Sequence, residues 1–214
     1  MKERSFVFIL AFLCVFFFKV TTPWAKVYID IESPSFRKFP IAITYFTNVG
    51  GGDKKEGISS EIFGVLSQDL EFSGLFNLID PSHFIEAGGE DTEPDNDGKT
   101  DFNDWSIIGA EGLVKGSFRC NGDDFKIEAK LYDVFRGQFI LGKRYVGNRQ
   151  DLRRMIHKFS DEIILSFTGE KGVFDTKIAF VLRESTHKEI YIMDFDGYDM
   201  RKVTDHRSIA VSPT

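Results

Sequence analysis

Residues 112–146 decide the fold, and they read GLVKGSFRCNGDDFKIEAKLYDVFRGQFILGKRYV. The segment contains three strand-like stretches, which are Gly112–Arg119, Phe125–Val134 and Gln138–Val146. The first turn is Cys120-Asn121-Gly122-Asp123, in which Asn-Gly favours a hairpin because both residues tolerate a positive φ. The second turn contains Arg136-Gly137. The segment therefore predicts a series of strands joined by tight hairpin turns.

Two amphipathic helices flank these strands. From Gly57 to Leu70 the apolar residues are spaced three and four apart, which places one apolar stripe on a helix, and Gly74 follows its end. A second stripe begins at Leu152, and Gly169 stops that helix. The stripes consist of Ile58, Ile62, Val65, Leu66 and Leu70 in the first helix, and of Leu152, Met155, Ile156, Phe159, Ile163, Ile164 and Phe167 in the second.

Three further strands are expected on the N-terminal side. Lys26–Ile31 (KVYIDI) alternates between apolar and polar residues. Phe39–Phe46 (FPIAITYF) is almost wholly apolar, as a strand covered on both faces would be. Phe76–Ile79 is a short strand that ends before Asp80-Pro81. With the helices, these strands predict an α/β domain with a mixed sheet and two main helices, over residues 26–172.

The sequence pattern changes after Gly172, from helices and strands to strands alone. Three short strands are expected at Lys177–Arg183, Glu189–Phe195 and Met200–Thr204, and no further helix is expected. Short strands joined by tight turns are typical of a β-propeller blade. We therefore expect residues 173–214 to form the start of an all-β propeller, namely an incomplete first blade.

The first 25 residues are typical of an export signal. Lys2 and Arg4 precede an unbroken apolar run of 13 residues, Phe6 to Phe18, whereas a membrane span needs roughly 20. Ala25 supplies a small residue before Lys26, so we expect cleavage between these two. We interpret the segment as a signal peptide that directs the protein to the periplasm. The alternative is a buried or membrane-anchoring N-terminal helix.

Charge and motif content argue against nucleic-acid binding and catalysis. The formal net charge is −6, and removal of the signal leaves −8, with no basic stripe for nucleic acid or anionic lipid. Cys120 would be the only cysteine of the exported chain, which excludes an intramolecular disulfide. The sequence lacks a nucleophile elbow, a phosphate loop, a dinucleotide fingerprint and a zinc-ligand spacing. We interpret His157, which lies inside the second helix, as a residue at the boundary of the core. We expect no enzymatic activity and no cofactor.

An acidic segment matches a calcium loop in part. Positions 1, 3, 5, 6, 9 and 12 of such a loop are matched in order by Glu93, Asp95, Asp97, Gly98, Asp101 and Asp104. Position 1 is Glu, position 12 is the shorter Asp, and no long amphipathic helix precedes the segment. Acidic loops are usually solvated, so we expect no metal and keep calcium as the weaker alternative.

Four stretches, in order along the chain, resemble the TolB family. Gln68–Asp80 (QDLEFSGLFNLID) resembles its D-L-x-x-S-G-x-F-x-x-x-D helix end, and Asp104–Gly116 (DWSIIGAEGLVKG) its W-x-x-x-G-x-x-x-x-V-x-G segment. Thr168–Val181 (TGEKGVFDTKIAFV) resembles its T-G-x-K-G-x-F-x-T-x-I-A-x-V junction between two domains. Glu189–Tyr198 (EIYIMDFDGY) resembles its first propeller repeat.

The resemblance implies a six-bladed propeller behind an N-terminal α/β domain, in an adaptor of the Tol-Pal system that supports outer-membrane constriction during division and envelope integrity. The propeller would bind the lipoprotein Pal, and other outer-membrane proteins are further partners. The first strand of the exported chain would dock on the body or be released towards TolA. Its matching positions here are Lys26, Val27, Tyr28, Ile29, Asp30, Ile31, Glu32 and Ser33. The alternative for this strand is a permanently paired sheet edge.

The chain departs from the family where it stops, at Thr214, because the family continues there into five more blades. We therefore expect most of the Pal-binding surface to be absent. Two other functions stay open: the front part of a periplasmic peptidase with a TolB-like propeller, and a small calcium-binding envelope protein built around residues 93–104.

Overall fold

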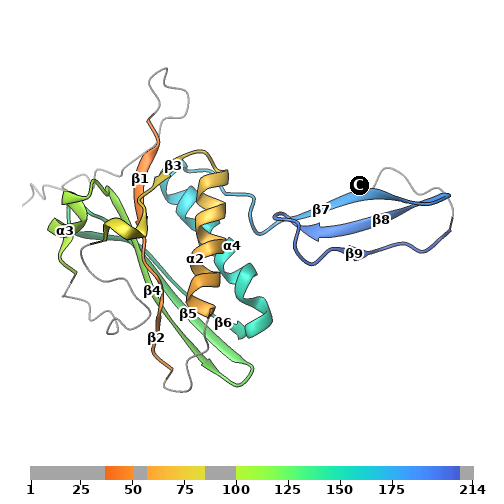
Figure 1. Cartoon of the computed structure of the whole chain (residues 1–214), viewed down its shortest axis with the longest axis horizontal. Helices are drawn as coiled ribbons and strands as arrows, with labels where there is room; N and C mark the ends of the chain where they lie inside the picture. The colour runs from red at the N-terminus through yellow and green to blue at the C-terminus, as the bar shows by residue number, and fades with distance from the viewer. Residues whose placement is uncertain (1–36, 51–56, 85–99, 208–214) are drawn as a thin grey trace, which may run out of the picture.

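The computed structural model describes residues 37–50, 57–84 and 100–207. These residues form a mixed α/β domain and a separate three-stranded sheet at the C-terminal side (Figure 1). The expected signal peptide and the expected strand Lys26–Ile31 lie outside the described residues.

The sheet of the α/β domain has six strands in the order β3-β1-β4-β5-β6, and the short β2 pairs with β4. β1 runs parallel to β3 and to β4, whereas β4, β5 and β6 are antiparallel neighbours. The strands are β1 (Phe39–Ile43), β2 (Thr47–Asn48), β3 (Phe76–Leu78), β4 (Gly112–Asn121), β5 (Asp124–Asp133) and β6 (Gln138–Asn148). All five residues of β1 are buried, which confirms the prediction of a strand covered on both faces.

The predicted hairpins are present. Asn121 pairs with Asp124, so the two central residues of the first turn are Gly122 and Asp123, one position later than an Asn-Gly turn would place them. Gly122 supplies the positive φ, at 59°. In such a two-residue turn this conformation matches the twist of the flanking strands.

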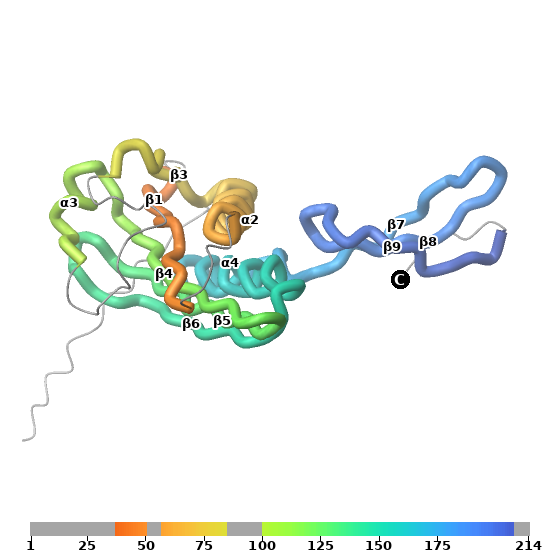
Figure 2. The backbone as a smooth tube through the Cα atoms, turned by 60° about the horizontal axis from the view of Figure 1, so that its bottom comes forward, coloured from red at the N-terminus to blue at the C-terminus, as the bar shows by residue number. Residues whose placement is uncertain are grey.

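Within the described residues, three α-helices accompany the sheet: α2 (Ile58–Phe72), α3 (Phe102–Ile107) and α4 (Leu152–Thr168). α2 and α4 are the two predicted helices, and they lie side by side against one face of the sheet (Figures 1 and 2). Gly169 ends α4 in the left-handed conformation, with φ 79°. The short α3 was not predicted. Single 3-10 turns occupy Pro81–His83 and Arg149–Asp151.

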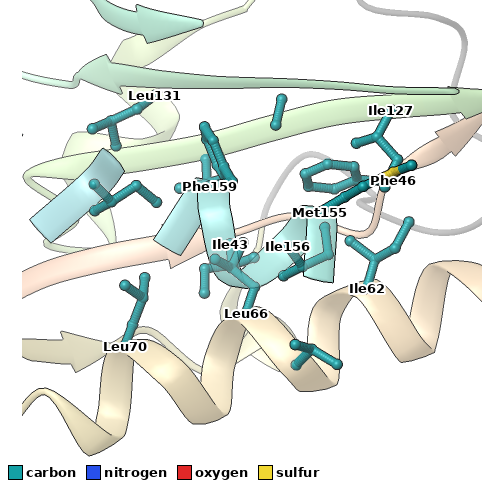
Figure 3. Close-up of a cluster of buried hydrophobic side chains, with 14 of the residues drawn as sticks. Ile43, Phe46, Ile62, Leu66, Leu70, Ile127, Leu131, Met155, Ile156 and Phe159 are labelled. Carbon is teal, nitrogen blue, oxygen red and sulfur yellow. The ribbon is translucent and has the colours of Figure 1, made fainter. Parts of the chain in front are cut away.

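The main core lies between the two helices and the sheet. Figure 3 shows Leu66 of α2, Phe159 of α4 and Leu131 of β5 converging in this layer. All three side chains are fully buried. Burying one side chain of this size stabilises a domain by about 1.5–3 kcal/mol. The apolar stripes read from the sequence are thus the surfaces that hold the domain together.

The C-terminal sheet consists of β7 (Lys177–Glu184), β8 (His187–Asp194) and β9 (Arg201–Lys202), in that order. It extends away from the α/β domain (Figure 2). From Asp175 to Arg207 the only buried side chain is that of Glu189. Its carboxylate accepts hydrogen bonds from the Thr204 hydroxyl at 2.5 Å and from the backbone N–H of Arg207 at 2.7 Å. The third strand is shorter than the predicted Met200–Thr204.

Candidate functional site: the junction between the two sheets

The connection from α4 to β7 is built from short-range hydrogen bonds and one close approach. The Thr168 hydroxyl accepts a hydrogen bond from the backbone N–H of Glu170 at 3.1 Å. The chain then passes so close to α4 that a Cβ on Gly172 would lie 2.2 Å from Oδ1 of Asp161. The backbone N–H groups of Phe174 and Asp175 donate to the Asp161 carboxylate, at 2.9 and 3.2 Å. The buried Asp161 therefore fixes the path by which the chain leaves the α/β domain.

Aromatic side chains join the two parts of the molecule. Phe174, 2% exposed, belongs to the main core of the α/β domain. Its ring meets that of Phe195, just after β8, edge to face with centroids 5.6 Å apart. Phe72, at the end of α2, also contacts the Phe195 ring edge to face, with centroids 4.9 Å apart. Such pairs contribute about 0.5–1.5 kcal/mol beyond the area that they bury.

A buried polar cluster lies beside these rings. Asp69 of α2 and His157 of α4 are each 3% exposed, and Nδ1 of His157 lies 2.9 Å from Oδ2 of Asp69. The Ser160 hydroxyl donates to the same carboxylate at 2.6 Å. A buried carboxylate needs such partners because burial without them is strongly unfavourable. The cluster therefore holds α2 and α4 together at the edge of the apolar core.

The C-terminal sheet reaches this cluster through Asp196. Its carboxylate oxygen Oδ2 lies 3.2 Å from Nε2 of His157, but without the alignment of a hydrogen bond. The same oxygen accepts a hydrogen bond from the Arg153 guanidinium. Arg153 also lies over the Tyr198 ring, 4.7 Å from its centroid. A pair of residues from the turn after β8 thus rests on two residues of α4.

The environment shifts the pKa values of both titrating groups. Burial acts to lower the pKa of His157, but the hydrogen-bonded Asp69 carboxylate and the charge of Asp196 outweigh burial and raise it. Burial acts to raise the pKa of Asp196, but the Arg153 hydrogen bond and the backbone N–H of Tyr198 lower it overall. Both shifts favour the charged pair His157⁺ and Asp196⁻.

The cluster does not have the geometry of a nucleophilic triad. In such a triad the histidine lies between the serine and the carboxylate, so that it can take the serine proton. Here Ser160 and His157 both bond to Asp69, and Nε2 of His157 faces a second carboxylate. The arrangement suits a structural contact that responds to protonation.

The sequence-based interpretation of His157 as a boundary residue is wrong, because the side chain is buried and hydrogen-bonded. The sequence did hold a signal for the cluster. Asp69 and Ser160 also lie on buried helix faces, within stripes that are otherwise apolar. A polar side chain inside such a stripe indicates a buried partner, although the partner itself cannot be read from the pattern.

Most of the site residues predicted from sequence lie outside the described residues, namely Ala25, the segment Lys26–Ser33, and Glu93, Asp95 and Asp97. Two of the calcium candidates are described. The Asp101 side chain caps α3 by accepting a hydrogen bond from the Asn103 N–H at 2.9 Å, and Asp104 lies in the first turn of that helix. No group of three or more metal-ligating side chains occurs within the described ranges. The expectation of no metal stays a prediction, and calcium stays the weaker alternative to it.

Comparison with known proteins gives the family. The model of the TolB amino-terminal domain matches residues 27–140. This chain belongs to the TolB family. The Tol-Pal system protein TolB of Syntrophotalea carbinolica is 36% identical over 99% of this chain and 47% of the relative, and that of Geobacter sulfurreducens is 35% identical over 98% and 47%. The chain thus spans about half the length of these curated TolB relatives.

The fold agrees with a solved TolB structure. The crystal structure of TolB from Acinetobacter baumannii matches 86% of this chain and 41% of that protein, with a TM-score of 0.59 and 26% identity. The match supports the mixed α/β architecture. Among the described helices, none combines the length and the apolar character needed to cross a membrane.

Proposed function

We propose that this chain acts as a periplasmic adaptor of the Tol-Pal system that links TolA and Pal. The observation that carries the proposal is membership of the TolB family, shown by the match over residues 27–140, combined with the mixed α/β fold of the described residues. The curated relatives are named Tol-Pal system proteins. In this role the protein serves outer-membrane constriction during division and envelope integrity.

The segment Lys26–Ser33 is the proposed contact with TolA. Its alternating residues Val27, Ile29 and Ile31 suit an edge strand that pairs either with its own sheet or with a partner's sheet. Backbone hydrogen bonds would give affinity, and the apolar side chains would set the register. The segment could not pair with its own sheet and with TolA at the same time, which would make it a switch.

The C-terminal sheet is the proposed start of a propeller that meets Pal. Its strands leave apolar side chains on the surface: Ile178 and Leu182 of β7 are 37% and 38% exposed. Val203, after β9, is 59% exposed. A blade in a propeller covers such surfaces with its neighbours. The unburied state of this sheet is therefore in keeping with a unit that packs against further blades.

Deletion of Lys26–Ser33 tests the adaptor proposal directly. We expect the deletion to leave the α/β domain folded and to abolish binding to the purified periplasmic part of TolA, measured by calorimetry. A matched control deletes residues 90–97, an acidic stretch of the same length. Undiminished TolA binding by the first variant would show that the segment has only a structural role.

Export tests the proposed location. Leu10→Arg with Leu13→Arg places two charges in the apolar run, each opposing membrane insertion by about 3 kcal/mol. The variant should stay in the cytoplasm with its first 25 residues uncleaved, whereas Leu10→Ile with Leu13→Ile should be processed normally. If the double Arg variant were found processed in the periplasm, the signal-peptide interpretation would be contradicted.

A further inference from the structure

His157 faces carboxylates that belong to different parts of the molecule. Asp69 lies on α2, within the α/β domain, and is hydrogen-bonded to Nδ1. Asp196 lies in the turn after β8 and is 3.2 Å from Nε2. The remaining charged group at the site is Arg153, one turn before His157 on α4. Only Asp196 can leave the site if the C-terminal sheet moves.

The protonation state of His157 decides whether the contact with Asp196 is favourable. Because Nδ1 donates to Asp69, neutral His157 presents the lone pair of Nε2 to the Asp196 carboxylate, and the two repel. Protonated His157 presents an N–H there instead, and the contact becomes a charge-assisted hydrogen bond or ion pair. Nε2 is buried and has no hydrogen-bond partner among the described groups, so its proton has no other acceptor to turn to.

Separation of the C-terminal sheet would act back on His157. The ring would lose Asp196, but it would keep Asp69 and also Arg153, whose positive charge would no longer be neutralised by Asp196. Both charge changes disfavour the protonated ring in the separated state, and the linkage requires that they exceed the gain in hydration of the ring. Proton binding at His157 and attachment of the sheet are therefore linked, and each must favour the other.

We propose that His157 is a proton-operated latch that fastens the C-terminal sheet to the α/β domain when it is protonated and releases it when it is neutral. The latch consists of His157, Asp69, Asp196 and Arg153. The latch does not require TolA or Pal. It would set the angle between the α/β domain and the C-terminal sheet.

The direction with pH follows from the contact with Asp196, whose charge acts to raise the pKa of His157 in the attached state only. The contribution of the latch is fully present below the pKa that His157 has in the separated state, and it is lost as the pH rises through the higher pKa of the attached state. Asp196 stays charged across this range, because the Arg153 hydrogen bond helps to lower its pKa. A pKa difference of one between the attached and separated states changes their ratio about tenfold.

Distance measurement between the two parts tests the latch. Spin labels at Glu71→Cys on α2 and Arg201→Cys on β9, in the full chain with Cys14→Ser and Cys120→Ser, report the separation by double electron–electron resonance. Both labelled positions are exposed. We expect one short, narrow distance at pH 5.5 and a growing long component at pH 9.

Two isosteric variants isolate the contact. Asp196→Asn removes the charge that His157 meets, so its distance distribution should be the same at both pH values. Asp199→Asn removes the same charge from an exposed position of the same turn and should respond to pH like the unmutated protein. NMR titration of the His157 ring should show a lower pKa in Asp196→Asn and no change in Asp199→Asn. An unmutated protein with identical distances at both pH values, or an Asp196→Asn variant that keeps the pH response, would overturn the proposal.

Discussion

The six-stranded sheet carries two helices on one face, whereas no described helix covers a face of the three-stranded sheet (Figure 1). In the first, neighbouring elements bury Leu, Ile and Phe side chains between them. In the second, the one fully buried side chain is the carboxylate of Glu189, held by hydrogen bonds from the strand end that follows. One sheet is stabilised by removal of apolar surface from water, the other by ladder hydrogen bonds and polar contacts. Their responses to perturbation should differ accordingly.

Amide hydrogen exchange should show the largest difference between the sheets. Local opening exposes little apolar surface in β7–β9 but would break the core around β4 and β5. We expect amides of β7 and β8 to exchange at least about 100-fold faster than those of β5, which corresponds to a difference in opening free energy of about 3 kcal/mol. Mass spectrometry of the exchanged peptides measures this. Equal protection in both sheets would mean that the C-terminal sheet is as stable against local opening as the α/β domain.

Truncation of one apolar side chain in each sheet sharpens the comparison. Phe159→Ala in α4 removes a fully buried ring and should lower the free energy of unfolding by about 3–5 kcal/mol. Ile192→Ala in β8 removes a half-buried side chain and should lower it by about 1 kcal/mol or less. Urea unfolding followed by circular dichroism compares the two. A loss in Ile192→Ala as large as in Phe159→Ala would break the distinction.

The junction between the sheets should be sensitive to a single methyl group. Gly172→Ala would place a Cβ 2.2 Å from Oδ1 and 3.0 Å from Cα of Asp161, so the connection must shift, at about 1–3 kcal/mol. Gly64→Ala, in the middle of α2, meets no atom within 4 Å and should stabilise the helix by about 0.5–1 kcal/mol. Thermal unfolding should therefore shift in opposite directions. Two shifts of the same sign would refute the close-packed junction.

Acid should act on the C-terminal sheet with the smallest effect of the four. Hydrogen bonds from the Tyr191 hydroxyl and from Lys202 outweigh burial and lower the pKa of Glu184 to about 2. A lowered pKa means that the contribution of this group is present above the ordinary value of about 4.3 and is lost as the pH falls towards 2. NMR signals of β7–β9 should broaden between pH 4 and pH 2 while those of the core persist. In Glu184→Gln this response should be smaller, and what remains should come from other carboxylates of the sheet, such as Glu189, whose Thr204 hydrogen bond lowers its pKa.

Sequence patterns predicted the elements far better than the contacts between them. The stripes on α2 and α4 and the turn at Gly122 follow from spacing within a few residues, which is local information. α3 escaped prediction because six residues, with Trp105 alone fully buried, give no periodic stripe. The contact between Asp69 and His157 joins positions 88 residues apart, and no local pattern specifies it. The position of Asp196 against this pair depends on the path set by Asp161 and Gly172, which only the folded chain displays.

The pairing of β1 has a consequence for the order of folding. β1 lies between β3 and β4, and its register joins Ile41 to Leu78 on one side and to Gly112 on the other. A chain that emerges from its N-terminus can pair β1 with β3 soon, but the second edge of β1 stays open until β4 has emerged. Contacts of such long sequence separation form slowly, whereas β4, β5 and β6 pair through tight turns. The wholly apolar strand FPIAI therefore keeps one edge open while about 70 residues follow it, and the arrival of β4 closes that edge to aggregation.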